Sequence, residues 1–148
     1  IEAVGEEYLD TYFEKCASLL TPDGVMVLQA ITIVDQRYQQ YVQEVDFIKR
    51  YVFPGGSLPS VSRMTDAINR KTDLVVRHLQ DIGFDYARTL KDWCDNFMHA
   101  RDKVHQLGYD DNFVRLWHFY LCYCEGGFME RATSAVHLVL SKPQNRSA

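Results

Sequence analysis

The chain has 148 residues, of which 47% are hydrophobic and 24% charged, as in one globular domain with a hydrophobic core. Sixteen Lys and Arg against twenty Asp and Glu give a formal charge of −4 with no run of like charges, so a nucleic acid partner is not expected. The longest apolar stretch, residues 25–34, is much shorter than the roughly 20 residues that span a bilayer, so no transmembrane helix is expected.

The first third of the chain alternates helix and strand. Apolar residues recur every three to four positions over residues 6–20 and predict a helix, which Pro22 and Gly24 end. The nearly continuous apolar and β-branched stretch 25–33 predicts a strand covered on both faces in a parallel sheet. Helical spacing resumes and predicts one helix over residues 35–51.

A turn-rich segment then separates these elements from the next helix. Residues 53–59 read Phe-Pro-Gly-Gly-Ser-Leu-Pro, which is compatible with neither a helix nor a central strand. Ser60 is placed to cap a short helix that ends near Asn69. Residues 73–82 and 135–140 have the composition of two further strands, so the fold class is α/β.

Two helices are predicted in the second half of the chain. Apolar residues with helical spacing over 86–107 predict a helix of about five turns, which Gly108 ends. Asp110 or Asp111 caps the next helix. We expect the glycine doublet 126–127 to end that helix.

The cysteines do not form a recognisable metal or disulfide pattern. They lie in predicted helices without a CxxC pair or a signal peptide, which favours reduced cytosolic thiols. Cys122 and Cys124 are two positions apart, about 200° around a helix, so their sulfurs point apart. None of the five histidines falls in an HExxH-like pair, and no metal site is expected.

Common catalytic and cofactor motifs are absent from the sequence. There is no GxGxxG or GxxxxGK string for a dinucleotide or phosphate, and no GxSxG elbow for a nucleophilic serine. Both glycine doublets, 55–56 and 126–127, follow predicted helices and are better explained as helix ends than as phosphate cradles. Composition and spacing therefore predict an α/β domain and no particular reaction.

Three segments together resemble one enzyme family over nearly the whole chain. They are residues 2–9 continuing to Leu28-Gln29-Ala30-Ile31, residues 46–60, and residues 82–90 continuing to Cys124-Glu125-Gly126-Gly127-Phe128. In order and spacing these strings are similar to cyclopropane-fatty-acyl-phospholipid synthases, which include the mycolic acid cyclopropane synthases. The resemblance rests on the whole set of strings.

The resemblance implies the C-terminal portion of a Rossmann-like class I methyltransferase sheet with a helical lipid-binding insertion. Residues 1–148 would form a single domain in which 35–70 and 84–130 are mainly helical insertion or lid. The chain opens with Ile1 in mid-pattern, and we expect the N-terminal cofactor-binding half to be absent. On that expectation the isolated chain neither binds S-adenosylmethionine tightly nor turns over.

The family's reaction moves a methyl group from S-adenosylmethionine to a cis double bond of a phospholipid acyl chain, forming a cyclopropane ring with bicarbonate as proton acceptor. The resemblance therefore implies two small-molecule partners, S-adenosylmethionine and bicarbonate, and unsaturated phospholipid acyl chains at a membrane surface. It implies a cytoplasmic enzyme with peripheral membrane association. A homodimer is left open.

Four residues take catalytic roles by position in the resemblance. Glu2 and Tyr86 match an active-site Glu and Tyr, and Ile31 matches an Ile whose backbone holds the bicarbonate. Gln29 stands where bacterial members have His, and its amide can hold bicarbonate but cannot relay a proton. We expect the four to converge around a small anion at the mouth of an apolar tunnel. The alternatives are a solvated loop position for Glu2 and simple core packing for Tyr86.

Two other functions stay open. Plant alkaloid N-methyltransferases share the architecture and act on small amines, although the intact string 53–59 and Tyr86 favour the lipid enzymes. A non-catalytic lipid-binding or dimerisation module is the other alternative, since a partial sheet exposes an edge and apolar faces.

Overall fold

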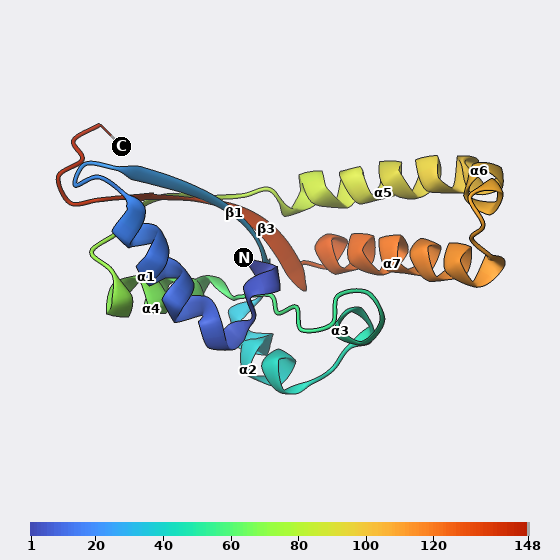
Figure 1. Cartoon of the computed structure of the whole chain (residues 1–148), viewed down its shortest axis with the longest axis horizontal. Coiled ribbons are helices and arrows are strands. Elements are labelled where there is room, and N and C mark those ends of the chain that lie inside the picture. The colour runs from blue at the N-terminus through green and yellow to red at the C-terminus, as the bar shows by residue number, and fades with distance from the viewer. Residues whose placement is uncertain (148) are drawn as a thin grey trace. The chain divides into compact units, whose positions relative to one another are not determined.

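The computed structural model describes residues 1–147, which divide into two compact units. The first unit comprises Ile1–Ile82 together with the segment from Ser134 onward, and the second comprises Gly83–Thr133. Their helices and strands are labelled in Figure 1. Within residues 1–147, no helix has the length and apolar character needed to cross a membrane.

The first unit contains a three-stranded sheet, four α-helices and two short 3₁₀ helices. In chain order its elements are η1 (Glu2–Val4), η2 (Glu6–Tyr8), α1 (Leu9–Leu19), β1 (Val25–Ile33), α2 (Asp35–Gln43), α3 (Phe47–Tyr51), α4 (Val61–Lys71), β2 (Val75–Asp81) and β3 (Thr133–Ser141). The helix predicted to begin after Ser60 is confirmed, and the Ser60 hydroxyl accepts a hydrogen bond from the Arg63 backbone N–H at 3.2 Å.

The strands lie in the order β1-β3-β2, so the last strand of the chain is in the middle. β2 and β3 are antiparallel, with Leu79 opposite Leu138. At the other edge the backbone N–H of Lys142, just after β3, donates to the carbonyl of Gly24, just before β1, at 2.9 Å. Two strands joined in this way run in opposite directions. The pairing of β1 with β3 is therefore antiparallel, and the described residues contain no parallel partner for residues 25–33.

Residues in β1 alternate between buried and exposed instead of being covered on both faces. Leu28 and Ala30 are buried, whereas the alternate residues Val27 and Gln29 are exposed. This is the pattern of a strand whose one face packs on helices. A continuous apolar stretch cannot distinguish a strand covered on one face from a strand covered on both. Val27 is apolar in either case, so the sequence does not show whether its side of the sheet is covered.

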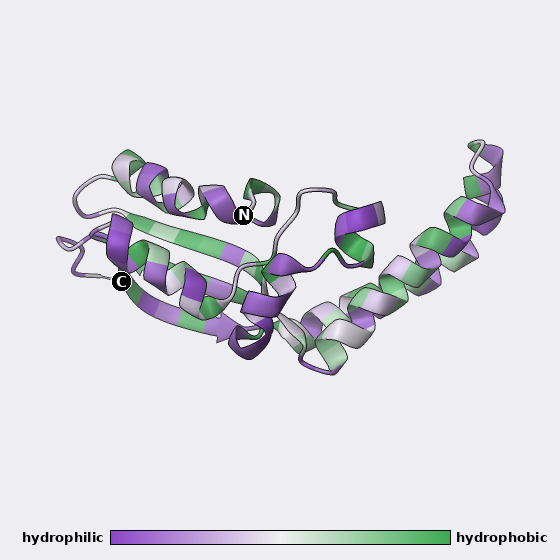
Figure 2. Ribbon diagram, turned by 90° about the horizontal axis from the view of Figure 1, so that it is seen from below, coloured by the Kyte–Doolittle hydropathy of each residue, from purple (hydrophilic) through white to green (hydrophobic). Residues whose placement is uncertain are grey.

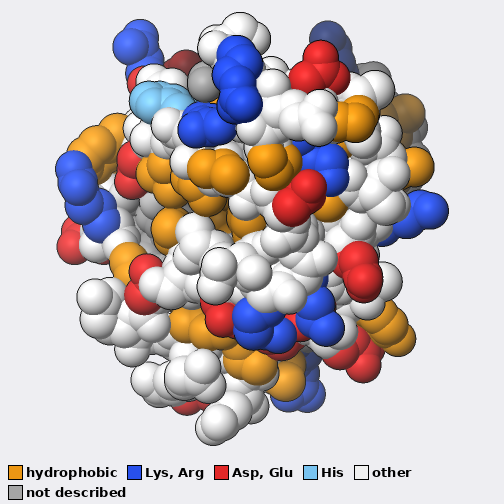
Figure 3. Space-filling view, turned by 90° about the vertical axis from the view of Figure 1, so that its left-hand side faces the viewer, with side chains coloured by type: hydrophobic (Ala, Val, Ile, Leu, Met, Phe, Trp, Pro, Cys, Tyr) orange, Lys and Arg blue, Asp and Glu red, His pale blue; other side chains and the backbone are white. Residues whose placement is uncertain are grey.

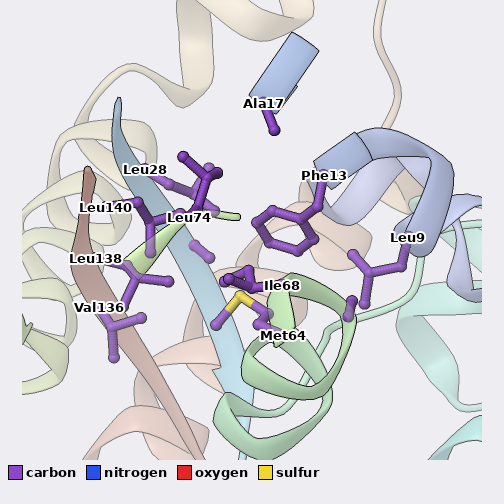
Figure 4. Close-up of a cluster of buried hydrophobic side chains, with 12 residues drawn as sticks. Leu9, Phe13, Ala17, Leu28, Met64, Ile68, Leu74, Val136, Leu138 and Leu140 are labelled. Atoms are coloured by element: carbon purple, nitrogen blue, oxygen red, sulfur yellow. The ribbon is translucent and has the colours of Figure 1, made fainter. Parts of the chain in front are cut away.

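Helices α1 and α4 cover one face of the sheet and form the core with it (Figure 4). Phe13 of α1 and Met64 of α4 are fully inaccessible to solvent, as are Leu138 and Leu140 of β3. Burying each of these side chains contributes about 1.5–3 kcal/mol. The face of the molecule shown in Figure 3 mixes hydrophobic side chains with charges of both signs.

The single helix predicted over residues 35–51 is wrong, because α2 ends at Gln43 and α3 begins at Phe47. The Asp46 carboxylate accepts from the backbone N–H of Lys49 at 2.8 Å and so caps a new helix. An Asp side chain that binds the backbone in this way competes with helix continuation. The Lys49 ammonium also donates to the carbonyls of Tyr41, at 2.6 Å, and Glu44, at 3.0 Å, which satisfies the end of α2.

The second unit is a pair of long helices joined at one end by a short one. These are α5 (Gly83–His99), α6 (Arg101–Gln106) and α7 (Asp111–Met129), with α5 and α7 packed side by side (Figure 1). Hydrophobic and hydrophilic residues are mixed along both long helices (Figure 2), as expected of helices with one buried side. The range 84–130 predicted to be mainly helical nearly coincides with this unit.

Two predictions for the helices of this unit are wrong, although the helical segment before Gly108 does end at Gln106. The helix predicted over 86–107 is interrupted at Ala100, where φ is −89° and ψ is 9°. The Asp95 carbonyl there lies 2.6 Å from Nδ1 of His99, a side-chain contact that competes with the helical ladder. At the other end of the hairpin, α7 runs through the doublet 126–127 to Met129 instead of stopping at it. The cap of α7 is Asp110, whose carboxylate accepts from the Phe113 N–H at 2.9 Å.

Candidate functional site

Glu2 and Ile31, two of the predicted site residues, are in direct contact. The Glu2 carboxylate Oε1 accepts a hydrogen bond from the backbone N–H of Ile31 at 2.5 Å. Glu2 lies on the short helix η1 and Ile31 lies near the end of β1, so the contact spans 29 residues of sequence. The Glu2 side chain is about one-third exposed, at 32%, so a small solute can reach it.

The turn-rich segment 53–59 holds Glu2 in place. The backbone N–H of Ser57 donates to the Glu2 carbonyl at 2.9 Å. Gly5 follows η1 with φ 82° and ψ 158°, a conformation that only glycine adopts readily, and a side chain there would face the Gly55 carbonyl. The Pro-Gly-Gly string therefore packs its backbone against the segment that carries Glu2. A Cβ on Gly56 would lie 3.9 Å from the Glu2 carbonyl.

Tyr12 of α1 is close enough to Glu2 to be affected by its charge. Burial, the neighbouring Cys16 thiol and the Glu2 carboxylate together raise the pKa of the Tyr12 hydroxyl to about 12. The Tyr12 hydroxyl therefore stays protonated at neutral pH. Tyr12 is therefore an additional polar group near Glu2. Its helical spacing in the sequence indicates only that it belongs to the apolar side of the helix.

A second network of charges lies on the same elements and fixes η2 against α4. The Arg63 guanidinium donates to Glu6 at 2.7 Å and to Asp10 at 2.9 Å, and the buried Tyr38 hydroxyl also donates to Glu6. Partial burial alone would raise the pKa of Asp10, but hydrogen bonds from Arg63 and Arg70 outweigh it and hold that pKa below its usual value. Burial and the Glu6 carboxylate raise the pKa of Tyr38.

Gln29 has a partner that the sequence did not indicate. Its Oε1 lies 2.9 Å from Nε2 of His137. Gln29 is on β1 and His137 is on β3, 108 residues later in the chain. The contact depends on β3 lying next to β1, and no local pattern in the sequence signals it.

Tyr86 lies in the second unit, near the start of α5. It is half-buried and its ring stacks on Phe128 of α7, with the ring centroids 5.2 Å apart and the planes at 30°. This stacking agrees with the packing role that was the alternative for Tyr86. Its convergence with Glu2, Gln29 and Ile31 stays a prediction.

The site residues of the first unit form two separate contacts, Glu2 with Ile31 and Gln29 with His137. The Ile31 N–H is donated to the Glu2 carboxylate, whose remaining lone pairs can accept a hydrogen bond from a solute that carries a proton. The carboxylate would repel an anion without such a proton.

Comparison with known proteins supports the family that the sequence strings resemble. Residues 1–138 match the family model described as mycolic acid cyclopropane synthetase. The tuberculostearic acid methyltransferase UfaA1 of Mycobacterium tuberculosis is 38% identical over 128 residues, which are 86% of this chain and 30% of that protein. The cyclopropane-fatty-acyl-phospholipid synthase of Escherichia coli is 31% identical over 141 residues, which are 95% of this chain and 35% of that protein.

The fold also matches a solved enzyme of this kind. The crystal structure of the mycolic acid cyclopropane synthase CmaA1 complexed with SAH and CTAB superposes with a TM-score of 0.85 and 24% identity, over 95% of this chain and 52% of that one. The chain spans about a third of the length of the two curated relatives, 30% and 35%. With the family model matched over more than nine-tenths of its residues, the chain belongs to the mycolic acid cyclopropane synthetase family.

Proposed function

We propose that this chain is part of an S-adenosylmethionine-dependent enzyme that adds a one-carbon group to the cis double bond of a phospholipid acyl chain and closes a cyclopropane ring. The observation that carries the proposal is the contact between the Glu2 carboxylate and the Ile31 N–H at the end of β1. Both positions have catalytic roles in the family to which the chain belongs. Relatives named for fatty acid and phospholipid substrates support the lipid as acceptor.

S-adenosylmethionine supplies the methyl group in such enzymes. The sequence has no glycine-rich string of the kind that binds a nucleotide cofactor, so none of this chain's residues is assigned to hold it. What the chain supplies is the site where a proton leaves. The Glu2 carboxylate, held in place by the Ile31 N–H, would accept a hydrogen bond from the O–H of a bound bicarbonate.

His137 extends this proposal beyond the residues that the resemblance assigned. The Gln29 Oε1 lies 2.9 Å from Nε2 of the His137 imidazole. We therefore place His137 as a positioning residue that orients the Gln29 amide. Replacing it with Phe in the complete protein should lower turnover, whereas His137→Gln, which can still donate a hydrogen bond to Gln29, should restore most of it.

The test uses cells that express the complete protein carrying this chain, with mass spectrometry of their lipids. Unsaturated phospholipids should gain the mass of one methylene group, and proton NMR should show cyclopropane ring hydrogens. A methylene branch has the same mass without the ring hydrogens, and a methyl branch on a saturated chain is heavier. Unchanged lipids with a methylated small amine in the extract would favour an amine N-methyltransferase and overturn the proposal.

A matched pair of variants tests the site itself. Glu2→Gln keeps the shape of the side chain but removes the charge that would hold the proton-carrying anion, so turnover should fall by about 10²-fold or more. Glu7→Gln changes an exposed carboxylate five positions away and should leave turnover essentially unchanged. If activity with Glu2→Gln equals that with Glu7→Gln at saturating bicarbonate, Glu2 is not part of the machinery.

A further inference from the structure

Three residues of the second unit bring soft donor atoms to one place on the paired helices. Cys94 lies on α5, and His118 and Cys122 lie on α7. The Sγ atoms of Cys94 and Cys122 are 3.8 Å apart, and the Cys122 Sγ is 3.6 Å from Nε2 of His118. All three donor atoms lie within 4.8 Å of one another.

These separations match the edges of a tetrahedral zinc site. With Zn–S bonds of about 2.3 Å and Zn–N bonds of about 2.0–2.1 Å, tetrahedral angles place two sulfurs about 3.8 Å apart and a sulfur and a nitrogen about 3.5–3.6 Å apart. The two printed edges agree with both values. The third edge, from Cys94 to His118, is no longer than 4.8 Å.

The positions of the donors on the helices also suit a bound ion. His118 and Cys122 are four residues apart and therefore lie on one face of α7 in successive turns, the spacing used by helical metal-ligand pairs. Cys94 is buried at the facing helix, whereas the other two are exposed, so an ion can enter from solvent and keep one open position. The ion would add a bond between two helices that already pack side by side.

The charges around the cluster favour a cation. Asp95 and Glu125 lie close enough to Cys94 to act on it electrostatically, and their negative charges attract a metal ion. Arg101, which lines a cavity of about 310 Å³ together with His118, is already paired with Asp111 at 2.6 Å. Two thiolates and one imidazole select a soft or borderline divalent ion such as Zn²⁺ over Mg²⁺ or Ca²⁺.

We propose that Cys94, His118 and Cys122 form a zinc site that clips α5 to α7, with a fourth coordination position open to water or to an added ligand. The sequence predicted no metal site, because the only close cysteine pair it shows is Cys122 and Cys124. In the structure the cysteine next to Cys122 is Cys94, 28 residues upstream, and not Cys124. The proposal is independent of the lipid reaction.

Cobalt titration of the full chain tests the proposal directly, since Co²⁺ takes zinc sites and reports its ligands. The reduced, metal-free chain should bind one Co²⁺, with a thiolate-to-cobalt charge-transfer band in the near ultraviolet and the intense visible bands of a tetrahedral ion. Adding Zn²⁺ should bleach both. Native mass spectrometry should find one zinc per chain, and zinc should raise the Tm in a manner that a chelator reverses.

Variants separate the proposed ligands from their neighbours. Cys122→Ser and His118→Gln should each weaken zinc binding by ~100-fold or more, since even losses outside the ligand set cost up to that much. Cys124→Ser, two positions along the same helix, should bind as the unchanged chain does, and far-UV circular dichroism checks that each variant is folded. The proposal is overturned if Cys124→Ser loses binding equally, if His118→Gln keeps it, or if no cobalt spectrum appears. The proposal is also overturned if Cys94 and Cys122 form a disulfide that persists in the presence of reductant and excludes cobalt.

Discussion

Arg63 is the residue on which the charged network of the first unit depends. Its side chain is 17% exposed and its guanidinium binds both Glu6 and Asp10. Replacing it with Met keeps the apolar stem but leaves two half-buried carboxylates beside each other. We expect Arg63→Met to lower the free energy of unfolding by about 1–2 kcal/mol. Urea denaturation measures the change, with Arg70→Met as control.

Arg70 is a fair control because it lies two turns further along α4 and also contacts Asp10, at 3.0 Å. The Arg70 side chain is 45% exposed, so water can replace the hydrogen bonds that Asp10 loses when Arg70 is changed to Met. The free energy of unfolding should therefore scarcely change. Equal destabilisation by the two variants would show that Arg63 acts only as one more surface charge.

The pH dependence of the Arg63 effect follows from the lowered pKa of Asp10. A carboxyl whose pKa is lower in the folded state contributes stability above its unfolded pKa of about 3.9, and this contribution disappears as the pH falls through the folded pKa. The difference in unfolding free energy between the unchanged chain and Arg63→Met should therefore be full at neutral pH and shrink below about pH 4. A difference that is constant from neutral to acid pH would rule out Asp10 as the partner concerned.

The glycine doublet within α7 gives a test at the level of one helix. Gly126 has open space where a Cβ would be, whereas a Cβ on Gly127 would lie 3.0 Å from Oγ1 of Thr133. Since a glycine inside a helix costs about 0.5–1 kcal/mol relative to alanine, Gly126→Ala should stabilise the chain by that amount. Gly127→Ala should lose most or all of this gain. Thermal unfolding of the two variants measures the difference, and equal gains would contradict the contact with Thr133.

The same doublet shows where sequence reasoning about elements fails. Turn signals predicted the strands and the start of α4 correctly, because Ser60 and Pro22 act on their immediate neighbours. Glycine is read as a helix end for an equally local reason, yet tertiary packing along α5 keeps α7 helical through it. The break at Asp46 was missed for the opposite reason, since a capping side chain inside an apolar pattern looks like an ordinary polar position.

At the scale of the whole molecule, the buried cluster around Phe13 and Met64 belongs to one unit. The buried cluster consists of residues from α1, α4, the sheet and Leu74, all of them in the first unit. Segments with fewer buried apolar contacts open at lower free energy. We expect native-state hydrogen exchange to show the amides of β3 opening only with global unfolding, and those of α7 opening earlier. Equal protection of the two peptides, followed by mass spectrometry, would contradict this division.

The candidate site shows the same limit at longer range. The contact of Glu2 with Ile31 was predictable only because the residues around each resemble a known family, since nothing local connects positions 29 residues apart. Gln29 with His137, and Cys94 with Cys122, were not predictable, because each pair depends on how separate elements pack. Sequence reasoning therefore supplied the residue types and the family, and the structure supplied the partners.

The strand order β1-β3-β2 also has a consequence for biosynthesis. During translation β1 and β2 leave the ribosome well before the strand that lies between them, and residues 83–132 must be made in the interval. Until Thr133–Ser141 emerges, neither strand has its described backbone partner, and Leu28 lacks the neighbouring core residues of β3. A nascent chain stalled in α7 would thus present unpaired strand edges to chaperones, and this sheet is completed only after α5, α6 and α7 have been made.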